Sequence, residues 1–570
     1  MNIRTELDLA NSAYEAEDFE SAHKTLMAVI EAFPETAQAY QLLSLILRKS
    51  GNLKGAFDAI QRAITLEPDN AEFQNSLGTF YRMTRRNDLA IAPFKRAVDI
   101  APNYLTAVMN LGDLYLQDSD PLSALAVFDG ALEEHKDHPK LRFARALALK
   151  DTLQYERALA ELQALPQTPD LALPVGQIFH ETGQIAAAKN AFAQGLSHPS
   201  AGAAIENYKN LIMLLKSHEG AESAKATLDQ ILQDNTENLL LAGTSAQLLG
   251  ELNFADEAKT VLEQADKKFG LHPYIAGIRG NLLIDDGKPQ DAVEQVAAIA
   301  EKGPLDAALM SIAARANLML GQADEAARYI RHARGLDPLN QYWIALDATQ
   351  KRQAGHEGYG QLYNFEKFVR HYDLEPPAEY GDLDHFITEV SQRLITMHDG
   401  QHHQTGQSLR GGGQTSENLI FAKDRVIQDF FQSLNAPLQD YMGEIGTEKD
   451  HILTGRNTQK HRFAGAWSVR LQGEGFHVNH VHPKGWISSS FYVQLPKPMD
   501  DHDTDKSGWI KFGEPSFAAL EPDGSIQGPQ HWVEPKVGRL VLFPSYMWHG
   551  TIPFSGDDIR LTLPFDAVPA

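Results

Sequence analysis

The chain has 570 residues, more than one hydrophobic core usually holds, so we expect two or three folding units. Its 75 acidic and 51 basic residues give a formal net charge of −24, which argues against nucleic acid or an anionic membrane as a partner. The absence of cysteine excludes disulfides and thiolate metal sites, so any metal ligands must come from His, Asp and Glu.

The N-terminal residues lack the basic start and the apolar run of a secretory signal. No segment approaches the roughly 20 consecutive apolar residues that a membrane helix needs. These two features predict a cytoplasmic protein that does not enter a membrane.

A 34-residue period organises the first two thirds of the chain. The same alanine recurs with this spacing, apart from two irregular steps in the middle of the array. The recurring residues are Ala22, Ala56, Ala90, Ala124, Ala158, Ala188, Ala224, Ala258, Ala292 and Ala326. An ordinary helical bundle with alanine-rich seams has no reason to keep such a register.

Leucine, glycine and tyrosine precede the alanine at fixed offsets, as in Leu77-Gly78 with Tyr81 and in Leu111-Gly112 with Tyr115. This pattern resembles the tetratricopeptide (TPR) repeat, in which two helices form each unit. We therefore expect residues 1–345 to form an all-α TPR superhelical solenoid of about ten repeats. Such arrays create a concave surface, which we expect to bind a peptide or protein substrate.

Residues 346–460 are expected to cap the repeats and to support the next domain with helices. The segment 341–345 looks like the start of the cap, and amphipathic patterns predict helices over 381–397 and 417–443. The glycine-rich segment 407–415 lacks the residue order of a phosphate-binding loop. We interpret it as a packed loop beside the functional site.

From residue 461 the apolar pattern changes to a period of two. Short alternating segments separated by Gly, Pro and Asp predict an antiparallel sandwich or jelly roll over 461–570, a class that includes the double-stranded β-helix. The expected strands are 467–471, 476–482, 486–495, 509–512, 538–543, 549–554 and 559–565.

Histidines are concentrated in this β-region. Because strand side chains alternate, His480 and His482 are expected on one face at a strand end, as two ligands of one metal require. His549, at the end of a distant apolar strand, is the candidate third ligand. His477 and Asn479 share the opposite face and are an alternative ligand pair.

Two polar residues share one face of the last predicted strand, Arg560 and Thr562, among apolar neighbours. An arginine in this setting suggests bidentate capture of a carboxylate, because its planar donors match two carboxylate oxygens.

These residues make the region similar to the iron(II) and 2-oxoglutarate-dependent oxygenase superfamily, in particular to bacterial oxygenases that follow TPR arrays. The similarity covers most of residues 341–570. The segments that carry it are Ser408 to Thr415, Trp467-Ser468-Val469-Arg470-Leu471, His480-Val481-His482-Pro483, Trp486-Ile487-Ser488, Trp509-Ile510-Lys511-Phe512-Gly513-Glu514-Pro515, Leu542-Phe543-Pro544-Ser545 through His549, and Arg560-Leu561-Thr562.

The resemblance implies Fe(II) and 2-oxoglutarate as cofactors. The implied metal ligands are His480, His482 and His549. Arg560 would bind the far carboxylate of 2-oxoglutarate, assisted by Thr562 or Tyr492. The residues expected to support this site from nearby are His477, Asn479, Arg470 and Trp548.

One residue departs from the superfamily pattern of His-x-Asp/Glu followed by a distal His, because His482 stands where the carboxylate is expected. Three neutral imidazoles leave a bound cation with its full charge. The change is consistent with a tri-histidine iron site, a different metal, or a reaction other than hydroxylation. A carboxylate ligand could also come from the acidic run Asp500, Asp501, Asp503 and Asp505, which otherwise reads as a solvated loop.

Taken together, these patterns predict an oxidoreductase: a hydroxylase-type dioxygenase whose TPR array recruits its substrate. The alternative is a TPR interaction scaffold whose β-domain binds metal through three histidines without turnover, or acts without 2-oxoglutarate.

Overall fold

Two compact units make up the protein, Met1–Pro166 and Gln167–Ala570. The computed structural model describes residues 2–398, 408–496, 506–554, 556 and 558–570. The boundary between the units falls inside the predicted solenoid, next to the short helix α10 (Tyr155–Gln163) and the 3₁₀ turn η1 (Pro169–Leu171). This is where the alanine spacing first becomes irregular. No helix in the described ranges is long and apolar enough to cross a bilayer.

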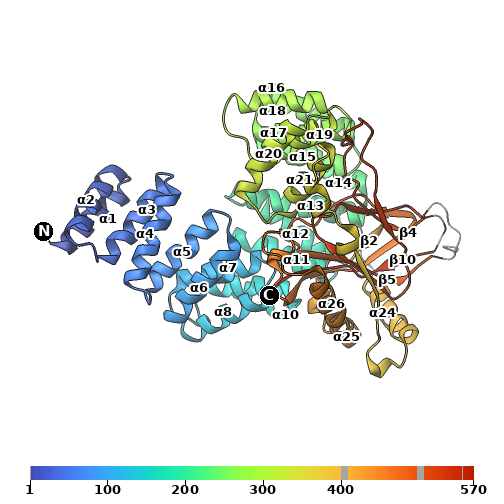
Figure 1. Ribbon diagram of the computed structural model, residues 1–570, viewed down its shortest axis with the longest axis horizontal. Helices are drawn as coiled ribbons and strands as arrows, with labels where there is room; N and C mark the ends of the chain where they lie inside the picture. Colours follow the sequence, from blue (N-terminus) through green and yellow to red (C-terminus); the bar gives the residue numbers. More distant parts are fainter. Residues whose placement is uncertain (1, 399–407, 497–505, 555, 557) are drawn as a thin grey trace. The chain divides into compact units, whose positions relative to one another are not determined.

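Helical hairpins build the first unit, and Figure 1 shows them in blue to cyan, stacked in chain order. Its helices are α1 (Ile3–Glu15), α2 (Phe19–Ala32), α3 (Ala37–Lys49), α4 (Leu53–Leu66), α5 (Ala71–Met83), α6 (Asn87–Ile100), α7 (Leu105–Gln117), α8 (Pro121–Glu134), α9 (Pro139–Asp151) and α10.

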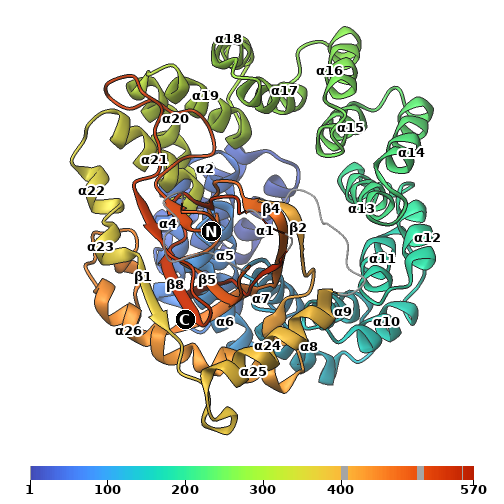
Figure 2. The same cartoon turned by 90° about the vertical axis from the view of Figure 1, so that its right-hand side faces the viewer.

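The second unit begins with further hairpins, and Figure 2 shows α11 to α20 following one another along an arc. These helices are α11 (Ala172–Glu181), α12 (Ile185–Gly195), α13 (Ala201–Glu219), α14 (Ala221–Asp234), α15 (Leu239–Glu251), α16 (Ala255–Phe269), α17 (Pro273–Asp285), α18 (Pro289–Ala300), α19 (Ala307–Met319) and α20 (Ala323–Leu336). The segment 341–345, which was expected to start the cap, forms the beginning of the next helix, α21 (Gln341–Gln353).

The repeated alanine explains why the array keeps its period. All ten recurring alanines are completely buried, and each is the fourth residue of the second helix in its hairpin. A small residue there lets the helices approach closely. The glycine of the pattern has the same role: a Cβ at Gly112 would lie 2.2 Å from the Phe128 ring. The predicted TPR solenoid is therefore present.

Short helices and turns connect the array to the β-region. They are α22 (Gly358–Leu362), α23 (Phe365–Phe368), η2 (Ala378–Tyr380), α24 (Leu383–His398), η3 (Leu419–Phe421), α25 (Arg425–Ser433), α26 (Asn435–Ile445) and η4 (Thr454–Arg456). The single helix predicted over 417–443 is wrong, because a turn and two helices cover it. Pro437 lies in the first turn of α26 and cannot donate the backbone hydrogen bond that would continue α25.

Antiparallel strands form the C-terminal region, as the alternation predicted. The strands are β1 (Arg370–Asp373), β2 (Leu409–Gln414), β3 (His461–Ala466), β4 (Val469–His477), β5 (Ile487–Gln494), β6 (Ile510–Phe512), β7 (His531–Val533), β8 (Arg539–Pro544), β9 (His549–Thr551), β10 (Arg560–Thr562) and β11 (Phe565–Pro569). In the described chain, one sheet has the order β1-β8-β5-β10-β4-β2, with β11 pairing with β5 and β3. A smaller sheet has the order β7-β6-β9.

Two strands of the larger sheet come from the region expected to be only helical support. β1 is too short to show a period, and β2 is the glycine-rich segment that was expected to be a loop. Glycine is normally depleted in strands, but here it is required: a Cβ at Gly412 would lie 2.3 Å from the carbonyl oxygen of Arg470 on β4. The segment is therefore a strand, and the loop prediction is wrong.

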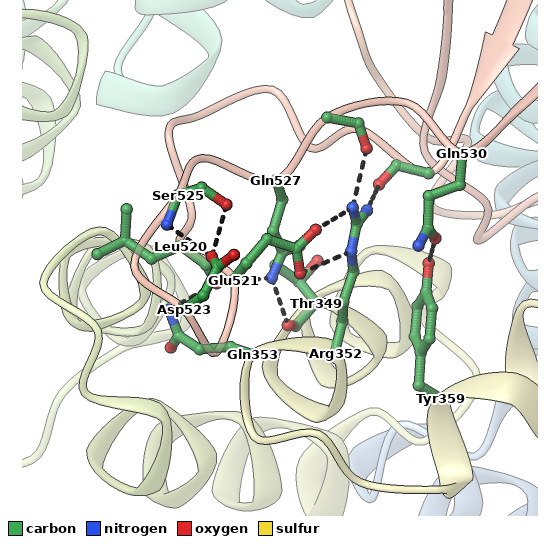
Figure 3. A network of polar contacts seen from close by, with 12 residues as sticks. Thr349, Arg352, Gln353, Tyr359, Leu520, Glu521, Asp523, Ser525, Gln527 and Gln530 are labelled. Carbon is green, nitrogen blue, oxygen red and sulfur yellow. Dashed lines mark hydrogen bonds and ion pairs between the residues drawn. The ribbon is translucent and has the colours of Figure 1, made fainter.

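A buried polar network joins α21 to the loop between β6 and β7 (Figure 3). Arg352, 8% exposed, forms an ion pair with Glu521 and donates to the carbonyl oxygens of Gly513 at 2.7 Å and Gly528 at 3.0 Å. Nearby, the indole nitrogen of Trp548 donates to the Thr349 hydroxyl of α21 at 2.9 Å. The cap helix α21 is thus fixed to the segment that precedes His549.

Candidate metal centre

A cavity of about 150 Å³ lies between the two sheets. Side chains of β5, β8 and β10 line it from the larger sheet, and β6 and β9 line it from the smaller one. The lining residues are Ser408, Gln414, Trp467, His477, His480, His482, Ser489, Ser490, Ile510, Phe543, His549, Gly550, Thr551, Arg560, Thr562 and Pro564.

Three histidines converge in this cavity. One ring nitrogen of each of His480, His482 and His549 lies within 4.8 Å of those of the other two. His480 and His549 are backbone partners: the amide of each donates to the carbonyl of the other, at 2.9 and 3.1 Å. The His482 amide donates to the Ser545 carbonyl at 3.0 Å. Backbone pairing therefore holds all three rings at one place.

The local structure differs from the expected strand end. β4 ends at His477, so His480 and His482 follow the strand, and His480 forms an isolated bridge with His549. The two rings still reach the same cavity, because the backbone hydrogen bonds between His480 and His549 hold this segment beside β9.

Hydrogen bonds fix the tautomer of each ring. The Nδ1 atoms of His480 and His549 lie 2.8 and 2.9 Å from the carbonyl oxygens of Val478 and Met547. Nδ1 of His482 lies 2.7 Å from both carboxylate oxygens of Asp566. Such oxygens only accept, so each Nδ1 carries a hydrogen, and Nε2 is the atom that bears the lone pair when the ring is neutral. The Nε2 atoms of His480 and His482 lie 3.3 Å apart, a spacing that a cation between the lone pairs would stabilise.

Burial favours the neutral form of the His480 and His549 rings. Burial, followed by the neighbouring His482, lowers the pKa of His480 to about 3. Burial and neighbouring histidines also hold the pKa of His549 and of His477 well below the usual value. Neutral imidazole is the form that binds metals, so His480 and His549 are in this form at neutral pH.

A buried cation also lines the cavity. Arg560 is 2% exposed, and its Nη1 donates to the Gly508 carbonyl at 2.7 Å. Within the described residues, its Nε and the Tyr492 hydroxyl lack a hydrogen-bond partner of good geometry, and no carboxylate pairs with the guanidinium. The guanidinium carbon lies 5.3 Å from the centre of the Tyr492 ring. A buried arginine in this condition is suited to an anionic ligand.

Family comparisons agree with this geometry. Residues 465–566 match the family described as "Putative 2OG-Fe(II) oxygenase". The tetratricopeptide repeat family matches residues 7–70, 58–104, 109–172 and 279–340. The protein therefore joins TPR repeats to a C-terminal 2OG-Fe(II) oxygenase-family domain.

Curated relatives match only part of the chain. Anaphase-promoting complex subunit 3 of Schizosaccharomyces pombe is 26% identical over 177 residues, 30% of this chain and 27% of that protein. The chloroplastic TPR protein PYG7 of Arabidopsis thaliana is 28% identical over 165 residues, 28% of this chain and 51% of that protein. The chain thus spans about half or less of the length of these relatives.

Solved structures show a similarly partial likeness. A TPR protein from Parabacteroides merdae has a TM-score of 0.34 and 17% identity, covering 46% of this chain and 98% of that one. PilF of Pseudomonas aeruginosa has a TM-score of 0.32 and 20% identity, covering 36% and 95%.

In the oxygenase-family domain, the residues expected to help bind 2-oxoglutarate lie near Arg560. Thr562 lines the cavity with it, whereas Tyr492 lies outside the lining with its ring against the guanidinium. Tyr492 is fully buried, and burial raises the pKa of its hydroxyl, which stays protonated and able to donate.

The expected supporting residues divide into two groups. His477 lines the cavity, and its Nδ1 lies 3.0 Å from the Ser408 hydroxyl, which is also 3.3 Å from Nε2 of His480. Asn479 lies outside the lining and donates to the Pro515 carbonyl at 3.3 Å. The alternative ligand pair of His477 and Asn479 is therefore not assembled around the cavity.

Two other expected supporting residues point away from the site. Arg470 pairs across the sheet with Leu561, which places it on the face opposite Arg560. Trp548 directs its indole toward α21, so its adjacency to His549 in the sequence gives no contact with the cavity. The acidic run at 500–505, considered as a source of a carboxylate ligand, lies outside the described residues.

The sequence reasoning missed Asp566. It lies six residues beyond Arg560, on β11, and accepts a hydrogen bond from the Ser488 hydroxyl at 2.6 Å as well as that from His482. An acidic residue in an otherwise apolar strand was the available signal. Its partner could not be predicted, because the contact depends on how β11 pairs with β5.

Proposed function

We propose that the oxygenase-family domain binds Fe(II) through three histidines and 2-oxoglutarate through Arg560, and hydroxylates a peptide or protein substrate. The proposed metal ligands are His480, His482 and His549. The observation that carries the proposal is their convergence in one cavity with a buried guanidinium that lacks a carboxylate partner in the described chain.

The donor set fits both cofactors. Three imidazoles with one ring nitrogen each directed to one place suit a divalent first-row metal. Arg560 has free donors for the far carboxylate of a small diacid, with the Thr562 hydroxyl on the same wall of the cavity. Phe543 and Ile510 add apolar surface to the wall of the cavity.

When bound, Fe(II) supplies the activation of O2. In the balanced reaction, substrate C–H, O2 and 2-oxoglutarate give substrate C–OH, succinate and CO2. The protein's own groups bind and orient the diacid and keep the cavity dry.

We assign the three regions of the chain to three tasks. Residues 1–345 would hold the substrate on the concave face of the repeats, 346–460 would cap and support, and 461–570 would carry the chemistry. The network of Arg352 supports this division, because it ties the cap helix α21 to the β-region.

A second candidate follows from His482 in place of a carboxylate. Here the domain is a tri-histidine centre that works without 2-oxoglutarate, or binds metal without turnover inside a TPR scaffold. The guanidinium of Arg560, which has no carboxylate partner among the described residues, favours the first candidate, because neither alternative requires an anion in the cavity.

Succinate production separates these candidates. Wild-type protein in excess over 2-oxoglutarate, incubated with Fe(II) and O2, should form succinate, whereas His480→Ala should form none. His461→Ala is the matched control, since this half-buried histidine lies on β3 outside the cavity lining. Oxygen uptake without succinate supports the 2-oxoglutarate-independent centre, and neither product nor uptake supports the scaffold.

A further inference from the structure

One carboxylate lies directly behind the metal site. Both oxygens of Asp566 are 2.7 Å from Nδ1 of His482, and the Asp566 side chain is 15% exposed. No other Nδ1 of the three converging histidines faces a charged group, because those of His480 and His549 face backbone carbonyls.

The position of Asp566 is built by the sheet. β11 pairs with β5 so that Asp566 lies opposite Ser488, whose hydroxyl donates to Asp566 Oδ1 at 2.6 Å. Ser488 also contacts the Ser545 hydroxyl at 2.8 Å, and the carbonyl of Ser545 accepts the backbone amide of His482. The carboxylate and the histidine are thus fixed to the same strands.

The His482 ring is held on its other side as well. Trp467 stacks against it, with ring centroids 5.8 Å apart and an interplanar angle of 30°. With Nδ1 bound to Asp566 and one face covered by the indole, the ring has a single orientation, which turns Nε2 into the cavity. Asp566 therefore decides where this ligand atom points.

Charge gives the second part of the argument. Three imidazoles add no negative charge to a divalent cation, whereas the sequence pattern of related oxygenases places a carboxylate at the position of His482. Here the carboxylate of Asp566 lies behind the His482 ring, in contact with its Nδ1. A carboxylate that accepts the Nδ1 hydrogen of a ligating histidine makes that histidine a stronger donor and offsets part of the metal charge.

We infer that Asp566 is the positioning residue of this metal centre, and that it supplies through His482 the negative charge that the three-histidine ligand set lacks. This inference rests on the proposed function. The centre is then a tri-histidine site with a carboxylate behind one ligand. Ser488 orients the Asp566 carboxylate, and Asp566 orients the His482 ring and increases the electron density on its Nε2.

The test compares Asp566→Asn with wild type in an anaerobic Fe(II) titration against a competing chelator. Asparagine keeps the size and one acceptor oxygen but removes the charge. We expect Fe(II) affinity to fall roughly 10–100-fold. The visible absorption spectrum of the Co(II)-loaded protein should also shift, because a weaker His482 donor changes the ligand field. Asp523→Asn, which removes the same charge from an exposed turn, should change neither quantity.

The outcomes separate this inference from the function on which it rests. If wild type binds Fe(II) and Asp566→Asn binds it equally well with the same Co(II) spectrum, the inference is overturned and the metal site stands. If wild type binds no Fe(II), both fail. Should Asp566→Asn not fold, Ser488→Ala serves instead: it removes the hydrogen bond that aims Oδ1 and should weaken Fe(II) binding, and unchanged affinity overturns the inference.

Discussion

Replacing Arg560 with methionine should weaken binding of 2-oxoglutarate without destabilising the ligand-free protein. In the structure the guanidinium is 2% exposed and, among the described residues, donates a hydrogen bond to the Gly508 carbonyl. Replacing a buried ion pair by apolar residues of similar volume is neutral or stabilising by about 1–4 kcal/mol, and we apply the same range to this buried charge without a counter-ion. Losing the hydrogen bond to Gly508 costs about 1 kcal/mol. The free energy of unfolding should therefore lie between about 1 kcal/mol below and about 3 kcal/mol above that of wild type.

The effect on the ligand has the opposite sign. A carboxylate bound by two charge-assisted hydrogen bonds gains about 1.5–3 kcal/mol from each, or about 3–6 kcal/mol in total. At 1.4 kcal/mol for each factor of ten, the Kd for 2-oxoglutarate should rise about 10²- to 10⁴-fold. Calorimetry on metal-loaded protein with the unreactive analogue N-oxalylglycine measures this Kd, and urea unfolding measures the stability.

Arg539→Met is the matched control. Arg539 lies on the neighbouring part of the same sheet, but it already pairs with Asp373, with Nε 3.2 Å from Oδ1. Its loss should lower stability slightly and leave the ligand Kd unchanged. If Arg560→Met instead lowers the free energy of unfolding by well over about 1 kcal/mol and leaves the Kd unchanged, Arg560 is a structural residue and the anion site is refuted.

Three further substitutions test the metal centre, the domain joint and the repeats. His480→Ala should reduce bound Fe(II), measured by elemental analysis after dialysis, from about one equivalent to near zero; retention of a full equivalent would contradict the ligand assignment. Arg352→Met leaves a carboxylate and two carbonyls without their donor and should lower the free energy of unfolding in urea by about 3 kcal/mol. Gly112→Ala places a Cβ 2.2 Å from the Phe128 ring and should cost about 1–3 kcal/mol, and an unchanged melting temperature would show that the helices separate freely.

The repeat array was predictable because one physical constraint recurs. Each hairpin needs a small residue at the helix crossing, so an alanine recurs once in every hairpin and is fully buried each time. The sequence pattern is then a direct image of the packing. The ends of the array were less predictable, because they depend on contacts such as that of Arg352 with the distant loop at Gly513.

In the β-region, the sequence predicted which residues of a strand share a face, but not how the strands pair with one another. A period of two placed Arg560 and Thr562 on one face, and both line the cavity. It could not show that Arg470 lies on the other face, because that depends on the register of β4 against β10. The period of two also gave no sign of the strand at Gly412. There the backbones of two strands approach so closely that only glycine fits, although glycine is normally disfavoured in strands.

The carboxylate of Asp566 shows the same limit in the candidate site. Residues 482 and 566 are far apart in the chain and meet only through the pairing of β11 with β5. Periodicity describes one strand at a time, so the residues that orient a ligand from a neighbouring strand are visible only in the folded chain.

A crystal grown anaerobically with Fe(II) and N-oxalylglycine tests the central claim most directly, through an anomalous difference map recorded at the iron absorption edge. The account predicts a single iron peak bound by the Nε2 atoms of three rings, with the analogue's far carboxylate on Arg560. The rings concerned are those of His480, His482 and His549. A cavity without an iron peak, or a peak held by other residues, would contradict it.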